Sequence, residues 1–434
     1  MMLLGVKYLM KDIQVSLFDI VMALSDVIDM VSPEIEGHHR RVAYMAVGIA
    51  RKMKLPEESI RNLFLAALLH DCGALSLKER LLTLQFEMGE TNGINSHAEM
   101  GYRLLRSFKP MDKAAQIIRY HHTYWNSPAN SASDGLKPPV ESFILHLADR
   151  VDVLTCRNRD YSMRADKIKE MIKRESGRKF MPDAVDAFLR LAGNRAFWME
   201  TANAQKESFR RDDFEDIILD LDGVFGVARL IEKIIDFRSR FTATHSSGVA
   251  AVAEELARAA GFRENECAMI KIAGYLHDLG KLAIPVEIIE KPDRLTEEEF
   301  NIMKKHTYYS YHILKKIKGL KDINHFASFH HERLNGKGYP FGLKADELSP
   351  GARVMCVADI FTAITEDRPY RKGMDTKQAL RALQSMVEND EIDPDLVDCL
   401  KSNYDRINGV RAESQLAAVK KYEEFLNPVG AGSV

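Results

Sequence analysis

An ordered series of histidine and aspartate motifs occurs twice along this chain of 434 residues. His38 and His245 begin the two copies, and a His-Asp pair follows 32 residues later in each. A lone histidine comes next, and a His-His pair stands 24 residues beyond it in both copies. Each copy then has an Ala-Asp dipeptide and ends on Pro-Asp-X-Val-Asp. Because a chance match of six motifs in one order is implausible, we predict two tandem domains of the same architecture.

The spacing of apolar residues predicts an all-α fold. Residues 14–31, 247–260 and 379–387 place apolar side chains three and four positions apart, whereas alternating strand-like runs are few. Gly and Pro gather at 126–139 and 335–351, which we expect to be loops. A polar, charged stretch at 203–216 follows the first copy. We therefore predict domains at 1–210 and 211–434.

The composition indicates an ordinary globular protein rather than a nucleic-acid or membrane protein. Hydrophobic residues make up 46% and charged residues 29%, and the net charge is −2, so no bulk attraction to DNA or membrane is indicated. No apolar stretch approaches the roughly 18–20 residues that span a bilayer, and the N-terminus is an unconvincing signal peptide. The five cysteines include no CxxC pair, which suits reduced thiols. We expect a cytoplasmic protein.

The repeated side chains are ligands of the kind that iron, manganese and zinc accept. In the C-terminal copy they are His245, His277, Asp278, His306, His330, His331 and Asp359. Adjacent residues on a helix point about 100° apart, so the His-Asp and His-His pairs serve one pocket most easily if it holds two ions, with Asp278 as a bridge. Two neighbouring metals are the recurring solution for phosphodiester hydrolysis, because they activate water and neutralise the phosphate. The histidines outside this frame are expected to be structural: His39, His146, His312 and His325.

Residues 240 to 400 resemble a known family. His-Asp-Leu-Gly-Lys at 277–281, His-His-Glu at 330–332, Gly-Tyr-Pro at 338–340 and Arg-Pro-Tyr-Arg at 368–371 look like an HD-GYP domain, a branch of the HD phosphohydrolases. The resemblance implies a helical domain with a di- or trinuclear iron or manganese centre that hydrolyses cyclic di-GMP to pGpG or GMP. It assigns metal binding to the seven residues above and substrate binding to Lys281, Gly338, Tyr339, Arg368 and Arg371.

The chemistry of these residues agrees with the implied roles. Asp278 and Lys281 are the predicted catalytic residues, since the Lys281 ammonium, one turn beyond Asp278, can meet a phosphate oxygen or the leaving group. Arg368 and Arg371 stand close enough to clamp the second phosphate. Tyr339 offers a ring on which a base can stack.

Two departures from the family pattern change the expectation. Phe241 stands where trinuclear members have a glutamate, so we predict two metal ions in this half, with iron or manganese favoured over zinc, nickel or magnesium. Asn335 replaces the usual aspartate before Gly336, which alters turn chemistry modestly.

The N-terminal half resembles the wider HD fold without the Gly-Tyr-Pro branch. Ala74 stands at the lysine position, and Asn158 and Tyr161 stand at the arginine positions. It keeps a candidate second metal site of lower weight, for which the residues are Glu34, His38, His70, Asp71, His97, His121, His122 and Asp149. The alternative is a decayed copy whose histidines only support the fold.

We therefore predict a metal-dependent phosphodiesterase for cyclic di-GMP, with catalysis in the C-terminal half. The first alternative is the same reaction on 3′,3′-cyclic GMP-AMP, which differs at one base edge. The second is a signalling module that binds nucleotide with little turnover, and it stays open for the N-terminal half. A cyclic dinucleotide is the predicted partner, and a homodimer is compatible with the sequence.

Overall fold

Helices account for nearly all regular structure in the part of the chain that the structure describes. This computed structural model describes residues 13–30, 36–74, 95–127, 137–156, 161–207, 209–236, 244–367 and 372–426. The described strands are β1 (Val15–Ser16) and β2 (Ile218–Leu219), which form one antiparallel pair. The predicted all-α class is confirmed.

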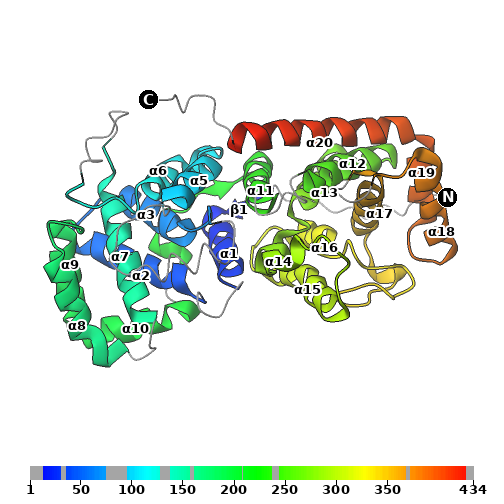
Figure 1. Cartoon of the computed structure of the whole chain (residues 1–434). Helices are drawn as coiled ribbons and strands as arrows, with labels where there is room; N and C mark the ends of the chain where they lie inside the picture. Colours follow the sequence, from blue (N-terminus) through cyan, green and yellow to red (C-terminus); the bar gives the residue numbers. More distant parts are fainter. Residues whose placement is uncertain are drawn as a thin grey trace.

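The helices form two lobes that lie side by side (Figure 1). The N-terminal lobe contains α1 (Leu17–Asp29), α2 (His38–Lys52), α3 (Glu57–Leu69), α5 (Asn95–Leu105), η1 (Lys109–Met111), α6 (Asp112–Arg119), α7 (Val140–Cys156), α8 (Tyr161–Arg174), α9 (Pro182–Ala192) and α10 (Arg195–Glu207). The C-terminal lobe contains α11 (Leu221–Asp236), α12 (His245–Ala259), α13 (Glu264–Leu276), η4 (Leu279–Ala283), α14 (Val286–Ile289), α15 (Glu297–Leu314), α16 (Lys321–Ser328), η5 (Ala345–Glu347), α17 (Pro350–Thr365), α18 (Thr376–Glu388), α19 (Pro394–Ser402) and α20 (Tyr404–Leu426). The short 3₁₀ helix η3 (Arg211–Asp213) connects them.

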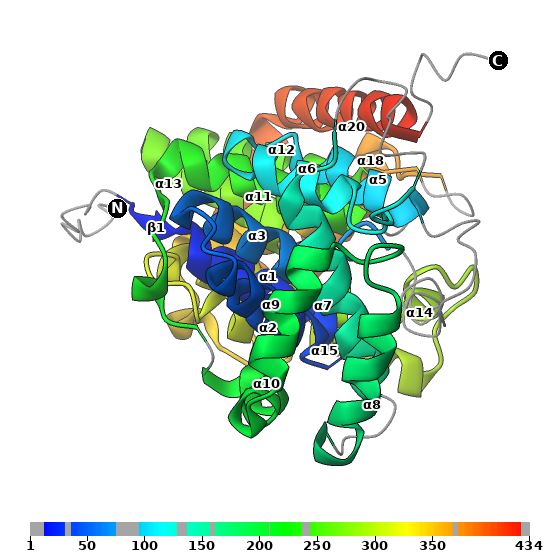
Figure 2. The same cartoon turned by 90° about the vertical axis from the view of Figure 1, so that its left-hand side faces the viewer.

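The same succession of helices builds both lobes, as the sequence repeat predicts. Helices α2, α3, α5, α6 and α7 of the first lobe correspond in order to α12, α13, α15, α16 and α17 of the second. Helices α8, α9 and α10 complete the first lobe on its outer side (Figure 2). The long helix α20 lies across the second lobe and packs on α12.

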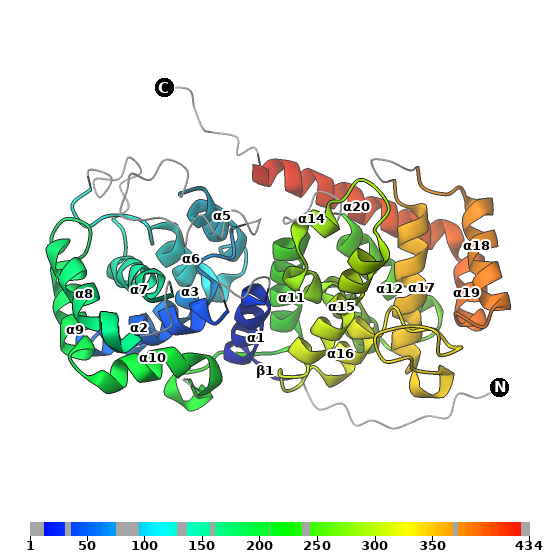
Figure 3. The ribbon, with the colours of Figure 1, turned by 60° about the horizontal axis from the view of Figure 1, so that its bottom comes forward.

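The lobes share one hydrophobic core rather than a loose hinge. Helix α1 lies between them beside α11 (Figure 3), and it contacts α3 of its own lobe as well as α15 and η4 of the other. Apolar side chains of α1 and α11 face one another across this seam, including Ile20, Leu24, Val227 and Ile231. These residues belong to one continuous cluster of buried side chains that extends through both lobes. The predicted boundary at 210 falls between α10 and η3 and stays a prediction.

Local sequence explains where the site-bearing helices begin. Thr296 caps α15 by accepting from the Glu299 N–H, while the Glu299 carboxylate accepts from the Thr296 N–H. Ser349 caps α17, whose first residue is Pro350. The expected helices at 14–31, 247–260 and 379–387 are observed as α1, α12 and α18. Within the described ranges, no helix combines the length and apolar content that crossing a membrane requires.

Candidate metal centres

The C-terminal donors converge from five segments of the fold. His245 begins α12, His277 ends α13, and Asp278 precedes η4. The remaining donors come from the middle of α15 (His306), the turn just after α16 (His330 and His331) and the third turn of α17 (Asp359). All seven predicted donors come together in one site, in which His331 is partly exposed and the other six are buried.

The donors form two groups with one carboxylate between them. His245, His277 and Asp359 offer ligand atoms that lie within 4.8 Å of one another, and so do His306, His330 and His331. Asp278 Oδ2 lies 3.2 Å from His277 Nε2, and its other oxygen, Oδ1, lies 3.5 Å from His306 Nε2. Asp278 therefore presents one oxygen to each group, as a bridging carboxylate would.

Backbone carbonyls fix the orientation of the imidazoles. The Nδ1 atoms of His277, His306 and His330 donate to the carbonyls of Gly274 (2.8 Å), Met303 (2.7 Å) and Ala327 (2.6 Å). Each carbonyl belongs to the residue three positions earlier, so the preceding turn of the chain itself holds the ring. Because Nδ1 is committed as a donor, Nε2 is left as the ligand atom and faces the cluster.

The charge states of three donors also suit a cation. Burial lowers the pKa of His306 to about 4 and that of His331 to about 3, so both rings are neutral at pH 7 and keep a free lone pair. Burial opposes ionisation of Asp278, but His277 and the Lys281 ammonium hold its pKa well below the usual value. Lys281 Nζ donates to Asp278 Oδ2 at 2.6 Å, as the predicted one-turn spacing requires.

His245 is held differently, by residues for which the sequence offered no motif. Its Nδ1 donates to Glu366 Oε2 at 3.1 Å, and Gln415 Nε2 on α20 donates to the same oxygen at 3.1 Å. Glu366 ends α17, seven residues beyond the ligand Asp359, so only the folded helix brings it beside His245. Metal-bound histidines commonly carry such a carboxylate on their second nitrogen.

A glycine after the His-Asp pair lets the lone-histidine helix approach. A Cβ on Gly280 would lie 1.9 Å from the His306 carbonyl oxygen, and a Cβ on Gly73 would lie 2.2 Å from that of His97. Ser310 strengthens the C-terminal contact, since its hydroxyl accepts from the Gly280 N–H and donates to the His277 carbonyl. The glycine thus sets the distance between the two donor groups in each lobe.

The Gly-Tyr-Pro loop, defined here as residues 335–343, is built around Glu332. The Glu332 carboxylate accepts from the N–H groups of Phe341 (2.7 Å) and Leu343 (3.0 Å), and the residue is fully buried. Gly338 lies so near that a Cβ there would come within 2.4 Å of the Glu332 Cα. The Tyr339 ring lies 4.8 Å from the His331 ring, at the edge of the donor cluster. Glu332 directly follows the His-His pair. The sequence motif therefore included this residue, but the sequence alone assigned it no role.

Asn335 fulfils its expected turn role. Its side-chain oxygen accepts from the Lys337 N–H at 3.0 Å, which is the bond an aspartate would make there. Several other predicted positions, Glu34, Phe241, Arg368, Arg371 and Asn158, lie outside the described residues, as does the Tyr161 side chain.

The N-terminal lobe assembles the same kind of centre. His38, His70 and Asp149 form one group, and His97, His121 and His122 form the other. Asp71 Oδ2 lies 3.6 Å from His70 Nε2, whereas Oδ1 lies 3.3 Å from His97 Nε2. The bridging position is therefore repeated in both lobes.

The surroundings of the N-terminal centre differ from those of its counterpart. Asp152 takes the place of Glu366, because His38 Nδ1 donates to it at 2.8 Å, and it raises the pKa of His38 to about 9 against the effect of burial. Arg150 donates to Asp149 Oδ2 at 2.7 Å, where the other lobe has Ile360. Ala74 is buried at the lysine position. The N-terminal lobe thus lacks the lysine but has a cation at another position, Arg150 beside Asp149. The sequence alone did not reveal this.

Three of the four histidines expected to be structural pack as expected. His325 stacks on Phe329, and His312 lies against Tyr308. His146 is buried and donates to the His121 carbonyl at 2.9 Å. His39 is different, since it forms a group with His70 and Asp71 whose ligand atoms lie within 4.8 Å.

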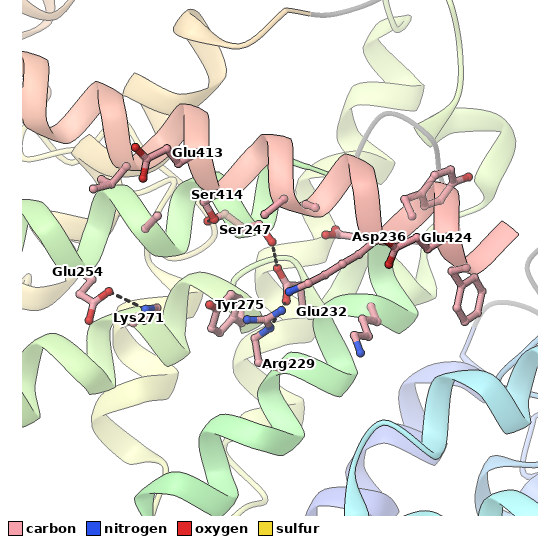
Figure 4. Close-up of a pocket in the computed structure, with 18 of the residues that line it drawn as sticks. Arg229, Glu232, Asp236, Ser247, Glu254, Lys271, Tyr275, Glu413, Ser414 and Glu424 are labelled. Carbon is pink, nitrogen blue, oxygen red and sulfur yellow. Dashed lines mark hydrogen bonds and ion pairs between the residues drawn. The ribbon is translucent and has the colours of Figure 1, made fainter. Parts of the chain in front are cut away.

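A cavity of about 820 Å³ lies behind the C-terminal centre, beneath α20 (Figure 4). Charged side chains of both signs line it, among them Arg229, Glu232 and Asp236. Asp236 accepts from Ser246 at 2.9 Å, and Ser246 follows the ligand His245. Helix α20 therefore covers the rear of the centre, while Gln415 supports Glu366 from the same helix.

Nitrogen and carboxylate donors, fixed tautomers and a shared aspartate together fit divalent metal ions in both lobes. In the C-terminal lobe Lys281, Tyr339 and the Gly-Tyr-Pro loop lie at the same site. In the described part of the N-terminal lobe, the residues after His122 form no such loop.

Comparison with known proteins agrees with both the repeat and the fold. Family models described as HD domain match residues 35–154 and 229–396, ranges that contain the two donor sets. A 3′3′-cGAMP-specific phosphodiesterase 1 of Vibrio cholerae is 30% identical over 87% of this chain and 89% of its own length. The 3′3′-cGAMP-specific phosphodiesterase 3 of that organism is 26% identical over 89% of this chain and 94% of its own.

Two further comparisons concern a shorter match and a solved structure. A cyclic di-GMP phosphodiesterase of Thermotoga maritima is 35% identical over 38% of this chain and 45% of its own length. The crystal structure of a cyclic GMP-AMP specific phosphodiesterase of V. cholerae superimposes with a TM-score of 0.61 at 23% identity, covering 90% of this chain and 98% of that one. This structural likeness shows the shared fold.

Proposed function

The chain belongs to the HD domain family, and we propose that its C-terminal lobe is a metal-dependent phosphodiesterase of the HD-GYP type that hydrolyses 3′,3′-cyclic dinucleotides. One observation carries the proposal. The Asp278 carboxylate lies between two donor groups, and Lys281 donates to it at 2.6 Å. A phosphodiester needs charge neutralisation on both sides of phosphorus and a cation near the leaving oxygen, and this site offers both in one place.

Each residue then has a definite task. His245, His277 and Asp359 would hold one ion and His306, His330 and His331 the second, with Asp278 shared. Two divalent ions, for which iron or manganese suits the donors, would activate water and offset the charge of the phosphate. Lys281 would move from Asp278 to a phosphate or leaving oxygen, since its Nζ already lies at the cluster.

The Gly-Tyr-Pro loop would bind the nucleotide. Glu332 orients this loop, and Tyr339 lies beside the ligand His331 with a ring that suits stacking on a base. Arg368 and Arg371, assigned by the family resemblance, would hold the second phosphate.

We favour 3′,3′-cyclic GMP-AMP as the substrate. Relatives that match this chain through both lobes are named for that substrate, whereas a cyclic di-GMP phosphodiesterase matches only 38% of the chain. Cyclic di-GMP remains the second candidate, because it has the same two phosphates and differs at one base.

The N-terminal lobe is proposed as a metal-binding partner that does not hydrolyse the same nucleotide. It has the bridging aspartate but Ala74 in place of the lysine, and no Gly-Tyr-Pro loop among its described residues. Its seam with the C-terminal lobe is a continuous apolar core, which suits a role in supporting the catalytic lobe.

The test compares Asp278→Ala with Asp71→Ala, the matched change in the other lobe. Both variants and the wild-type chain are loaded with Mn²⁺ and assayed separately on the two cyclic dinucleotides, with products identified by mass spectrometry. Asp278→Ala should lose more than the roughly 10–100-fold typical of residues that only orient a ligand, whereas Asp71→Ala should keep most turnover. Hydrolysis by Asp278→Ala at the wild-type rate would refute the assignment, and faster hydrolysis of cyclic di-GMP would reverse the substrate order.

A further inference from the structure

His39 lies directly beside two residues of the N-terminal donor set, His70 and Asp71. The side chain is 1% exposed, and its Nδ1 is hydrogen-bonded to the Asp29 carboxylate. Its Nε2 is buried and has no hydrogen-bond partner among the described residues. The ring centroid lies 4.9 Å from that of His70, and His39 forms a potential ligand group with His70 and Asp71.

The pairing of His39 with a carboxylate repeats the way the recognised ligands are held. His38 donates through Nδ1 to Asp152, and His245 does so to Glu366. For His38 and His245 the carboxylate fixes Nδ1 as the donor while Nε2 faces the cluster, which is the usual arrangement of a metal-bound histidine. Asp29 occupies Nδ1 of His39 in the same way and leaves Nε2 as the nitrogen that can ligate.

The corresponding position of the C-terminal lobe cannot act in the same way. Ser246 follows His245 as His39 follows His38, and it donates to Asp236 as His39 does to Asp29. Ten residues separate the partners in both pairs. The serine side chain ends at the hydroxyl that donates to Asp236, whereas an imidazole has a second nitrogen on the opposite side of its ring.

A buried ion pair between His39 and Asp29 is the simpler interpretation, but it leaves Nε2 unexplained. A metal ion held together with His70 and Asp71 would give the buried Nε2 a partner that Asp29, bonded to Nδ1, does not provide.

We propose that His39 Nε2 is an additional ligand of the N-terminal metal centre. This rests on the proposal that the N-terminal lobe binds metal. The ion beside His38, His70, Asp71 and Asp149 then has five protein donors, one more than the corresponding set around His245. Because metal sites with more protein ligands leave fewer positions for water or substrate, the N-terminal ion is retained more firmly and is less suited to hydrolysis.

The test uses the full chain and measures metal binding directly. Wild type, His39→Ser and His70→Ala are stripped, equilibrated with buffered Mn²⁺ and analysed for Mn per chain. His39→Ser installs the residue that the other lobe carries beside its own aspartate, so the fold has a precedent for it. We expect the affinity for one N-terminal ion to fall at least about tenfold in His39→Ser, and the ion to be lost in His70→Ala.

A second readout separates ligation from packing. Mn²⁺ that binds only the folded chain raises the melting temperature, and this rise should shrink in His39→Ser and in His39→Gln, which keeps an N–H donor for Asp29. If His39 only pairs with Asp29, both variants will melt lower without metal but show the wild-type Mn²⁺ affinity and the wild-type rise, and the proposal is overturned.

The controls keep this result apart from the catalytic proposal. If His70→Ala leaves the Mn content unchanged, the N-terminal centre itself is refuted, and His39 with it. Hydrolysis of cyclic dinucleotide should continue in all three N-terminal variants, because that activity is assigned to the other lobe and is tested separately with Asp278→Ala.

Discussion

Gly280→Ala tests whether the distance between the two C-terminal donor groups is set by backbone contact. The new Cβ would lie 1.9 Å from the His306 carbonyl oxygen and 2.9 Å from the Ser310 nitrogen. Real Cβ atoms essentially never approach closer than 3.0 Å, so α15 and η4 must separate by at least 3.0 − 1.9 = 1.1 Å. Both opposing atoms belong to the backbone and cannot rotate away.

That displacement acts on the two residues that carry chemistry. His306 is on α15, and Asp278 directly precedes η4, so the shift widens the 3.5 Å gap between them. A misplacement of about 1 Å can cost about 100-fold in rate, and overpacking of this kind costs about 1–3 kcal/mol of stability. We therefore expect kcat to fall about 100-fold, together with a lower melting temperature.

Two matched glycines complete the experiment. Gly73→Ala meets the His97 carbonyl at 2.2 Å in the other lobe, so it should lower the melting temperature comparably while most cyclic-dinucleotide hydrolysis survives. A Cβ at Gly409 would meet no atom of the described residues within 4 Å, so Gly409→Ala should change neither property for the worse. A kcat for Gly280→Ala within twofold of wild type would show that the contact does not set the geometry of the site.

Three further changes probe the same centre. Lys281→Ala should lower kcat about 100-fold with an unchanged Mn content. If kcat and Mn content fall by the same factor, Lys281 only supports Asp278. Glu332→Gln replaces one of the two carboxylate oxygens that accept from the Phe341 and Leu343 N–H groups. Hydrogen bonds to a charged group are worth about 1.5–3 kcal/mol, so KM should rise about tenfold or more while metal content holds; a change confined to kcat would contradict its role in orienting the loop. Gln415→Leu removes the bond to Glu366 and should weaken Mn²⁺ binding by less than about tenfold, as measured by metal titration, and an unaltered titration would disprove this support of His245.

The repeat made the donors predictable, because a metal centre is specified by residue type, order and spacing together. His277 and Asp278 are adjacent in sequence, and the helix end turns them toward one cluster while the carbonyl of Gly274 fixes the ring. The residues that hold the donors were not predictable in the same way. Glu366 and Asp152 serve equivalent histidines from different offsets along α17 and α7, so no shared motif marks them.

The fold class followed from helical periodicity, but the contact between the lobes did not. Helix α1 was expected as an ordinary amphipathic helix of the first domain. It is apolar on more than one face because it packs against α3 on one side and against α15 and η4 on the other. Periodicity detects a buried face and cannot say which partner buries it.

The two lobes also differ in where they place positive charge. This difference bears on whether the N-terminal metal centre is a decayed copy of the C-terminal one. The N-terminal lobe has Ala74 at the position of the C-terminal lysine. Arg150 instead donates to Asp149, a ligand of one donor group, whereas Lys281 donates to Asp278, the carboxylate shared by both groups. A cation on the shared carboxylate stands beside the space between the two groups, where a bridging phosphate would bind. A cation on Asp149 instead neutralises a ligand at the edge of one group. With His39 added on that same side, the N-terminal centre has the features of a site that retains an ion, and the C-terminal centre those of a site that exposes one.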